Sequence, residues 1–210
     1  YPRNLADDLA ACQREGVDLV FAPEPAEIYP AGFRTFVEVG ELGEHLCGKS
    51  RPGHFRGVAT VVTKLLNIVQ PDRAFFGQKD AQQARIIRQV VRDLDLPVEV
   101  VIGPTIREPD GLALSSRNRY LSPADRRHAT ALIETLREVR RRVEAGDRDA
   151  AALRKWMAER VRSTPGAKLD YAEIVDADSF QPVTALSGPA VAALAVQFGS
   201  TRLIDNVDLP

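Results

Sequence analysis

The sequence is poor in the residues that crosslink small proteins or bind metal ions. Among its 210 residues are two cysteines, three histidines and one methionine. Cys12 and Cys47 form no CxxC pattern, and neither has metal-ligand spacing with His45, His54 or His128. We therefore expect free thiols in a reducing cytoplasm rather than a disulfide framework, and we expect no metal site.

An excess of charge and a long apolar run are also absent. The 28 Lys and Arg residues nearly balance 29 Asp and Glu residues, for a net charge of -1, so bulk charge implies no nucleic-acid partner. No run approaches the length of a membrane span and no signal peptide is recognisable, so we expect no membrane partner. With 44% hydrophobic and 27% charged residues, the composition is typical of a globular protein with one large or two small domains.

The sequence also lacks an initiator methionine. It opens on Tyr1-Pro2-Arg3, and its single methionine is Met157. Such an opening is typical of the interior of a longer protein. We therefore expect a chain that is truncated at its N-terminus.

The most informative stretch runs from Arg73 to Leu94. Arg73-Ala74-Phe75-Phe76 predicts a buried strand that Gly77 ends. A helix pattern follows at once, with an apolar stripe at Ala84, Ile87, Val91 and Leu94. Gly77–Asp80, which we call the corner, would therefore join a strand to a helix.

A corner of this kind suits a phosphate group. Backbone N–H groups and the positive end of the helix point outward there, and Lys79 adds a mobile cation. Gln83 lies four residues further along, so we expect it on the same helix face as Lys79. Spacing alone is equally compatible with a solvated lysine, and the GxxxxGK[ST] pattern of a Walker loop is absent.

The rest of the first half predicts alternating strands and helices. Val17–Phe21 and 98–102 read as strands, and Thr35–Val39 reads as a strand or an extended loop. Helices are expected after Asn4, over Leu42–Leu46, and over Phe55–Val69, where apolar residues on several faces predict a largely buried helix. The order favours an α/β fold, a Rossmann-like parallel sheet with helices on both faces.

The pattern of the sequence changes after Ile102. The turn-rich segment 103–111 is the best domain boundary, so we predict domains 1–106 and 107–210. Ser122-Pro123 should begin a long helix that ends at Gly146, and Asp149 should cap a second helix. Strands are expected over 170–175, 191–196 and 201–206. Together they predict a small α+β domain in which an antiparallel sheet packs on two helices.

Two further polar features are ambiguous when taken alone. Ser115-Ser116-Arg117-Asn118 offers two hydroxyls, a guanidinium and an amide, which can surround a polyphosphate, but a capping turn is the commoner role. His54 at a predicted helix start could face a ligand or donate to a nearby carbonyl. The second role is favoured, because the sequence shows no partner for this histidine.

Taken together, these motifs resemble one family, the pantothenate synthetases or pantoate–β-alanine ligases. A KMSKS-like loop that closes over ATP is known in nucleotidyltransferases related to class I aminoacyl-tRNA synthetases, and Ser115–Asn118 resembles it. The resemblance covers the whole chain, in the stretches Tyr1-Pro2-Arg3, Tyr29-Pro30, Arg51-Pro52-Gly53-His54-Phe55, Phe76–Asp80 with Gln82-Gln83, Asp110–Asn118 and Arg202-Leu203-Ile204-Asp205-Asn206.

The resemblance implies the fold, the reaction and the partners. Residues 1–106 would be a partial nucleotidyltransferase domain without its first strand, and 107–210 a C-terminal lid. Pantoate carboxylate would attack the α-phosphate of MgATP to give pantoyl adenylate and pyrophosphate. The amine of β-alanine would then displace AMP. ATP with Mg²⁺ would be a substrate rather than a bound cofactor, and the family suggests a cytoplasmic homodimer.

The resemblance also implies site residues. The ATP contacts would be Gly77, Gln78, Lys79, Asp80, Ile106, Leu114, Ser115, Ser116 and Arg117. Of these, Lys79, Ser115, Ser116 and Arg117 would neutralise the charge that gathers on the phosphoryl group, so they are the expected catalytic residues. Gln83 would bind pantoate.

Two departures from the family leave an alternative open. The family's HxGH loop is not in this sequence, and Cys47 stands where some relatives have an acidic residue. The chain would therefore be an incomplete ligase. The alternative is a non-catalytic remnant that binds nucleotide or dimerises, and a relative that adenylates another small acid is a third hypothesis.

Overall fold

The computed structural model describes residues 4–210, which divide into two compact units between Thr35 and Phe36. The smaller unit contains α1 (Leu5–Arg14) and α2 (Pro25–Ile28). As the sequence predicts, the side chain of Asn4 caps α1 by accepting from the backbone N–H of Asp7. The positive φ of Gly16 follows the end of that helix.

The predicted strand Val17–Phe21 does not form. This segment is irregular, pairs with no strand of residues 4–210, and leaves the side chain of Leu19 84% exposed. A strand is stabilised by the hydrogen bonds of a neighbouring strand. Apolar alternation indicates which residues favour a strand, but it does not supply that neighbour.

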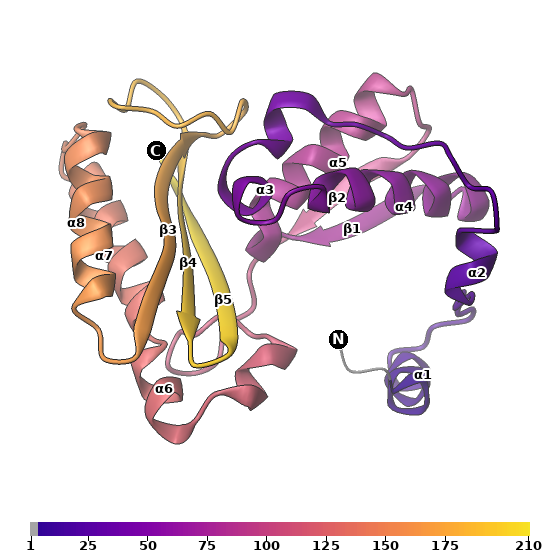
Figure 1. Cartoon of the computed structure of the whole chain (residues 1–210), viewed down its shortest axis with the longest axis horizontal. Coiled ribbons are helices and arrows are strands. Elements are labelled where there is room, and N and C mark those ends of the chain that lie inside the picture. Colours follow the sequence, from indigo (N-terminus) through magenta and orange to yellow (C-terminus); the bar gives the residue numbers. More distant parts are fainter. Residues whose placement is uncertain (1–3) are drawn as a thin grey trace. The chain divides into compact units, whose positions relative to one another are not determined.

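The first part of the larger unit is mixed α/β. Parallel strands β1 (Arg73–Gly77) and β2 (Glu99–Gly103) pair in register and are linked by α5 (Ala81–Asp93), with α4 (His54–Val69) packed on α5. Figure 1 shows both helices beside the two strands. Of the two alternatives predicted for Thr35–Val39, a strand or an extended loop, the structure shows the extended loop. The N–H of Val37 donates to Oγ1 of Thr60 at 3.0 Å.

Burial in this part is lower than the sequence predicts. Phe75 in β1 is 71% exposed, and β1 pairs with no strand except β2 within residues 4–210. α4 buries Phe55, Ala59, Thr60 and Leu66 but exposes Ile68 and Val69 at its end. α5 buries Ala84 and Ile87 as expected, while Leu94 is exposed just beyond the helix end.

The segment before α4 also differs from the prediction. Instead of a helix over Leu42–Leu46, a 3₁₀ turn, η1 (Gly40–Gly43), is followed by α3 (Leu46–Ser50). The amide of Gln82 on α5 donates to the carbonyls of Leu42 and His45, at 2.8 Å each, so these carbonyls are satisfied by a tertiary contact. Gly48 is required here, since a Cβ would collide with the carbonyl oxygen of Gly43.

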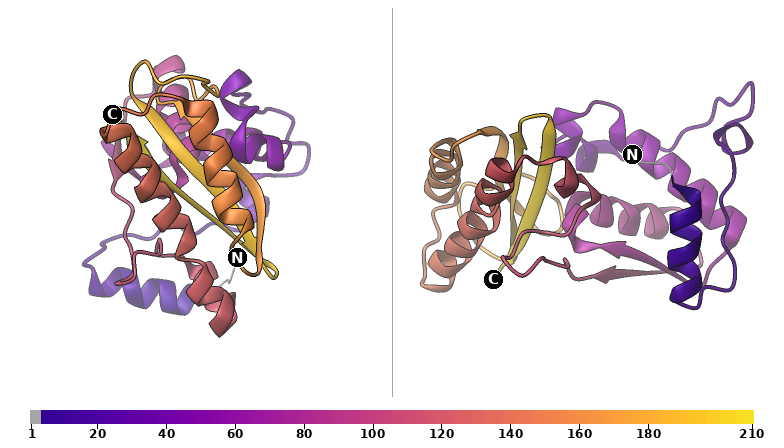
Figure 2. Two further views of the ribbon diagram at one scale, coloured as in Figure 1. Left: turned by 90° about the vertical axis from the view of Figure 1, so that its left-hand side faces the viewer. Right: turned by 90° about the horizontal axis from the view of Figure 1, so that it is seen from below.

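The second part of the larger unit is the predicted antiparallel sheet on two helices. The strands β3 (Ala167–Asp176), β4 (Ala190–Phe198) and β5 (Thr201–Leu209) lie in that order. The helices α7 (Ala131–Glu144) and α8 (Ala150–Arg162) cover one face (Figure 1), and Figure 2 shows the strands edge-on beside them. Their buried side chains, among them Leu136, Met157 and Leu194, form the main core.

The other face of this sheet is covered as well. Val175, Val191 and Ala193 pack against Leu46 of α3 and against Phe180. β4 is therefore buried along almost its whole length, as expected of a central strand with both faces covered. This second face brings β3 and β5 against the α3–α5 region, where the candidate site lies.

The helix predicted from Ser122 to Gly146 is interrupted. Ser122 caps α6 (Pro123–His128) as expected, by accepting from the N–H of Asp125. A tight turn at Ala129 and Thr130 then separates α6 from α7, where the N–H of Leu132 bonds three residues back to Ala129. The two parallel strands lie before residue 106, and the three antiparallel strands lie after it. The division into domains 1–106 and 107–210 stays a prediction.

Candidate functional site

The corner Gly77–Asp80 joins β1 to α5 as the sequence predicts, but through a different local structure. Gly77 ends β1, and Gln78–Asp80 form a 3₁₀ turn, η2, before α5 begins at Ala81. Lys79 therefore precedes the helix rather than lying in its first turn. The expected i, i+4 relation between Lys79 and Gln83 within one α-helix is wrong.

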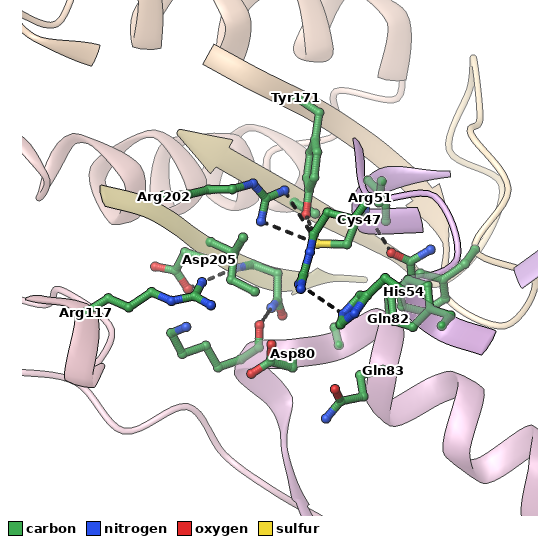
Figure 3. Close-up of a pocket in the computed structure, with 18 residues that line it drawn as sticks. Cys47, Arg51, His54, Asp80, Gln82, Gln83, Arg117, Tyr171, Arg202 and Asp205 are labelled. Atoms are coloured by element: carbon green, nitrogen blue, oxygen red, sulfur yellow. Dashed lines mark hydrogen bonds between the residues drawn. The ribbon is translucent and has the colours of Figure 1, made fainter. Parts of the chain in front are cut away.

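Lys79 and Gln83 are nevertheless brought together by a pocket, which we call the central pocket. Its free volume is about 70 Å³, and Figure 3 shows the side chains that surround it. The lining comes from α3, α4, the corner, α5, η3 (Ser116–Tyr120), β3, β4 and β5. Its polar members are Cys47, Arg51, His54, Lys79, Asp80, Gln82, Gln83, Arg117, Tyr171, Arg202, Asp205 and Asn206.

The central pocket carries more positive than negative charge. Within residues 4–210, the side chains of Lys79 and Arg117 make neither an ion pair nor a hydrogen bond. Arg202 is paired with Asp170 at 2.7 Å, and Asp205 is paired with Arg107. Two cations without partners at the edge of a small cavity favour an anionic ligand.

His54 faces this pocket instead of a backbone carbonyl. A guanidinium N–H of Arg51 donates to its Nε2 at 3.1 Å (Figure 3). Burial lowers the pKa of His54 below its ordinary value, and the positive charges of Arg51, Arg202 and Arg117 lower it further, against the opposing effect of Asp80. The lowered pKa favours the neutral ring, and the bond from Arg51 makes Nε2 an acceptor.

Cys47 lies at the inner side of the pocket. Its thiol is 3.3 Å from the hydroxyl of Tyr171 and 3.7 Å from the Arg202 guanidinium, while its N–H donates to Gln82. Burial and the neighbouring Cys47 raise the pKa of Tyr171, so this phenol stays protonated. Within residues 4–210, no group of three or more His, Cys, Asp or Glu side chains has the arrangement of a metal site.

Two neighbouring residues of β5 connect the parts of the site. The carboxylate of Asp205 holds the Arg107 guanidinium with two hydrogen bonds, of 2.7 and 3.0 Å. The amide of Asn206 donates to the backbone carbonyls of Gln78 and Lys79, at 3.0 Å each. Sequence reasoning gave neither residue a role, although both lie in the Arg202–Asn206 stretch that carries the family resemblance.

The other predicted site residues do not line the central pocket. They are Gly77, Gln78, Ile106, Leu114, Ser115 and Ser116. The amide of Gln78 donates to Asp208, and Oγ of Ser115 caps η3 by accepting from the N–H of Arg117. Ile106 and Leu114 have exposed side chains and share a backbone hydrogen bond of 2.8 Å. Their roles as ATP contacts stay predictions.

The fold and the pocket define an α/β protein with a pocket suited to an anionic ligand. The chain belongs to the pantoate-beta-alanine ligase family, whose model matches residues 1–208. It is 52% identical to a pantothenate synthetase of Acetivibrio thermocellus and 54% identical to one of Moorella thermoacetica. These matches cover 99% and 100% of this chain and 74% of each relative. The chain is thus assigned to a ligase family of pantothenate biosynthesis.

Solved structures agree with this assignment. A pantothenate synthetase from Thermus thermophilus matches with a TM-score of 0.94 and 47% identity, over 100% of this chain and 76% of the other. A pantoate-beta-alanine ligase from Francisella tularensis, complexed with beta-gamma ATP and beta-alanine, matches with a TM-score of 0.75 and 36% identity, over 99% of this chain and 70% of the other. The predicted family and fold class are confirmed. None of the helices within residues 4–210 is long and apolar enough to cross a membrane.

Proposed function

We propose that this protein condenses pantoate with β-alanine to form pantothenate at the expense of ATP, through a pantoyl-adenylate intermediate. The observation that carries the proposal is the convergence of the unpaired cations Lys79 and Arg117 with Gln83 in the central pocket. The ligands named for the Francisella tularensis relative, an ATP compound and β-alanine, support the same substrates. Membership of a ligase family favours the enzyme over the non-catalytic alternative.

The first step transfers an adenylyl group. A carboxylate oxygen of pantoate attacks the α-phosphorus of MgATP, and the bond to the β-phosphate bridging oxygen breaks, so pyrophosphate leaves. Negative charge gathers on the phosphoryl oxygens and on the leaving group in the transition state. Lys79 and Arg117 would stabilise that charge, because neither is neutralised by a carboxylate of the described chain.

The second step transfers the acyl group. The uncharged amine of β-alanine attacks the acyl carbon of pantoyl adenylate and loses a proton. The bond between that carbon and the phosphate oxygen breaks, and AMP leaves with both electrons. AMP therefore keeps one oxygen that began in the pantoate carboxylate. The Mg²⁺ enters with ATP as part of the substrate.

The ATP-binding set is proposed in two groups. Lys79, Asp80 and Arg117 line the central pocket, where the phosphates would bind. Gly77, Gln78, Ile106, Leu114, Ser115 and Ser116 would contact the rest of the nucleotide. A homodimer and a cytoplasmic location rest on the family resemblance alone and stay predictions.

Pantoate-dependent exchange of labelled pyrophosphate into ATP tests this function. The first step is reversible, so the protein should return label to ATP when pantoate is present and β-alanine is absent. An exchange rate that does not depend on pantoate, or that another small acid supports equally well, would contradict the proposed substrate.

Gln83 is expected to select pantoate rather than ATP. It lies on the first turn of α5, beyond Lys79, and contributes a neutral amide to the pocket. Gln83→Ala should raise the KM for pantoate by about tenfold, the loss typical of a hydrogen bond to a charged group, with the KM for ATP within about twofold. Gln89→Ala, on the same helix but outside the pocket, is the matched control. Equal increases in both constants would show that the corner is only distorted.

A further inference from the structure

We propose that Asn206 is a positioning residue that holds Lys79 in its catalytic place by fixing the backbone of the corner. The proposal rests on the proposed function, since it concerns how Lys79 reaches the phosphates. Asn206 lines the central pocket, but both N–H groups of its amide are used on the corner. It acts through the two carbonyls that it bonds.

The contacts of Asn206 converge on the turn that carries Lys79. Its side chain is buried, and Nδ2 donates to the carbonyl oxygens of Gln78 and Lys79, at 3.0 Å each. Its Oδ1 accepts from the amide of Gln78 at 3.4 Å. An amide has two N–H donors, and both are used on successive peptide groups of one turn. The orientation of those peptide groups sets the direction in which the Lys79 side chain leaves the backbone.

The turn needs such external support. η2 is a three-residue 3₁₀ turn between β1 and α5, and none of its residues is buried. Short 3₁₀ turns have poor hydrogen-bond geometry of their own. Lys79 also has no side-chain partner within the described residues that would hold it in place. The two hydrogen bonds from the amide of Asn206 therefore hold the conformation of this turn, which its own hydrogen bonds hold only weakly.

Asn206 is itself fixed by its neighbour. Its backbone N–H donates to the buried carboxylate of Asp205 at 2.8 Å, and that carboxylate binds Arg107 through two hydrogen bonds. Arg107 also donates to the carbonyl of Gly111, on the segment that leads to Arg117. Asp205 thus holds Asn206 beside the corner and also anchors Arg107, which in turn binds the backbone at Gly111.

A double-mutant cycle separates positioning from a purely structural role. In a single-turnover assay of adenylate formation with the intact protein, Asn206→Ala should lower the rate by about 10- to 100-fold, the effect of a displaced catalytic group. In the Lys79→Ala background the same substitution should lower the rate by less than about twofold, since its effect passes through Lys79. Rates are normalised to the folded fraction measured by near-UV circular dichroism.

Two further variants keep the test decisive. Asn206→Asp keeps the size of the side chain but replaces the donor group by oxygen, so it should repeat the non-additive loss if Asn206→Ala folds poorly. Gln197→Ala is the matched control, because Gln197 also donates from an amide to a carbonyl, that of Gly199, outside the central pocket. It should leave the rate unchanged in both backgrounds.

The outcomes separate the positioning role of Asn206 from the proposed ligase function on which it rests. Equal losses in the two backgrounds, or no loss in either, would overturn the positioning role while leaving the ligase proposal intact. A Lys79→Ala variant as fast as the parent protein would overturn the positioning role together with the role of Lys79. Absence of pantoate-dependent exchange in the parent protein would overturn the proposed function itself.

Discussion

Replacement of Lys79 by alanine is expected to lower turnover by about 10²- to 10³-fold, the usual loss when one preorganised charge or donor is removed from a developing anion. The reason is its position, since Lys79 lies at the corner and lines the pocket without a carboxylate partner among the described residues. The ammonium therefore contributes little to the folded state and is available to a phosphate. The melting temperature should stay close to that of the parent protein.

The two quantities have to be measured on the same preparations. Turnover is followed by pantothenate formation, and stability by thermal unfolding. Lys168→Ala is the matched control, because Lys168 is an exposed lysine on β3 outside the central pocket, and it should change neither quantity. If the melting temperature of Lys79→Ala falls sharply while the rate per folded molecule holds, Lys79 is structural and its catalytic role is wrong.

Replacement of Asp205 by alanine is expected to have the largest effect on stability, about 3–5 kcal/mol of the free energy of unfolding. The Asp205 side chain is 1% exposed and that of Arg107 is 20% exposed, and they share two hydrogen bonds. Removal of the carboxylate leaves a mostly buried guanidinium without its counter-charge. It also leaves the backbone N–H of Asn206 without its acceptor.

Urea unfolding at equilibrium measures this effect. Asp208→Ala, three residues along the same strand, is the matched control, because Asp208 is exposed and its carboxylate accepts from the Gln78 amide at the surface. It should change the free energy of unfolding by no more than about 0.5 kcal/mol. A loss of less than about 1 kcal/mol for Asp205→Ala would show that the pair is compensated by solvent, and that its place at the centre of the site is not needed for folding.

Features that depend on neighbouring residues could be predicted from the sequence. The caps at Asn4, Ser122 and Asp149 each accept a hydrogen bond from a backbone N–H three residues ahead. The strand-to-helix change at Gly77 is equally local, because Gly77 interrupts one apolar period and another begins after it. The sequence therefore located the corner, and with it Lys79.

Features that depend on distant residues could not be predicted. Whether Val17–Phe21 pairs, and how far Phe75 is buried, depends on which strands lie alongside, and apolar patterns do not state this. The contacts of Asn206 join residues that are 128 and 127 positions apart. For His54 the sequence favours a bond to a carbonyl, although its hydrogen-bond partner Arg51 lies only three residues earlier. Its other charged neighbours, Arg117 and Arg202, are remote in the sequence. The stretch Arg202–Asn206 held the signal, since the family resemblance already rested on it.

The transfer of ¹⁸O from pantoate to AMP tests the central claim most directly. Pantoate labelled in its carboxylate is converted in the presence of ATP and β-alanine, and the AMP is analysed by mass spectrometry. If the carboxylate attacks the α-phosphorus, each AMP should carry one ¹⁸O in its phosphoryl group, and pyrophosphate should carry none. Unlabelled AMP, or label recovered in inorganic phosphate together with formation of ADP, would contradict the adenylate intermediate and show that the pocket activates pantoate in another way.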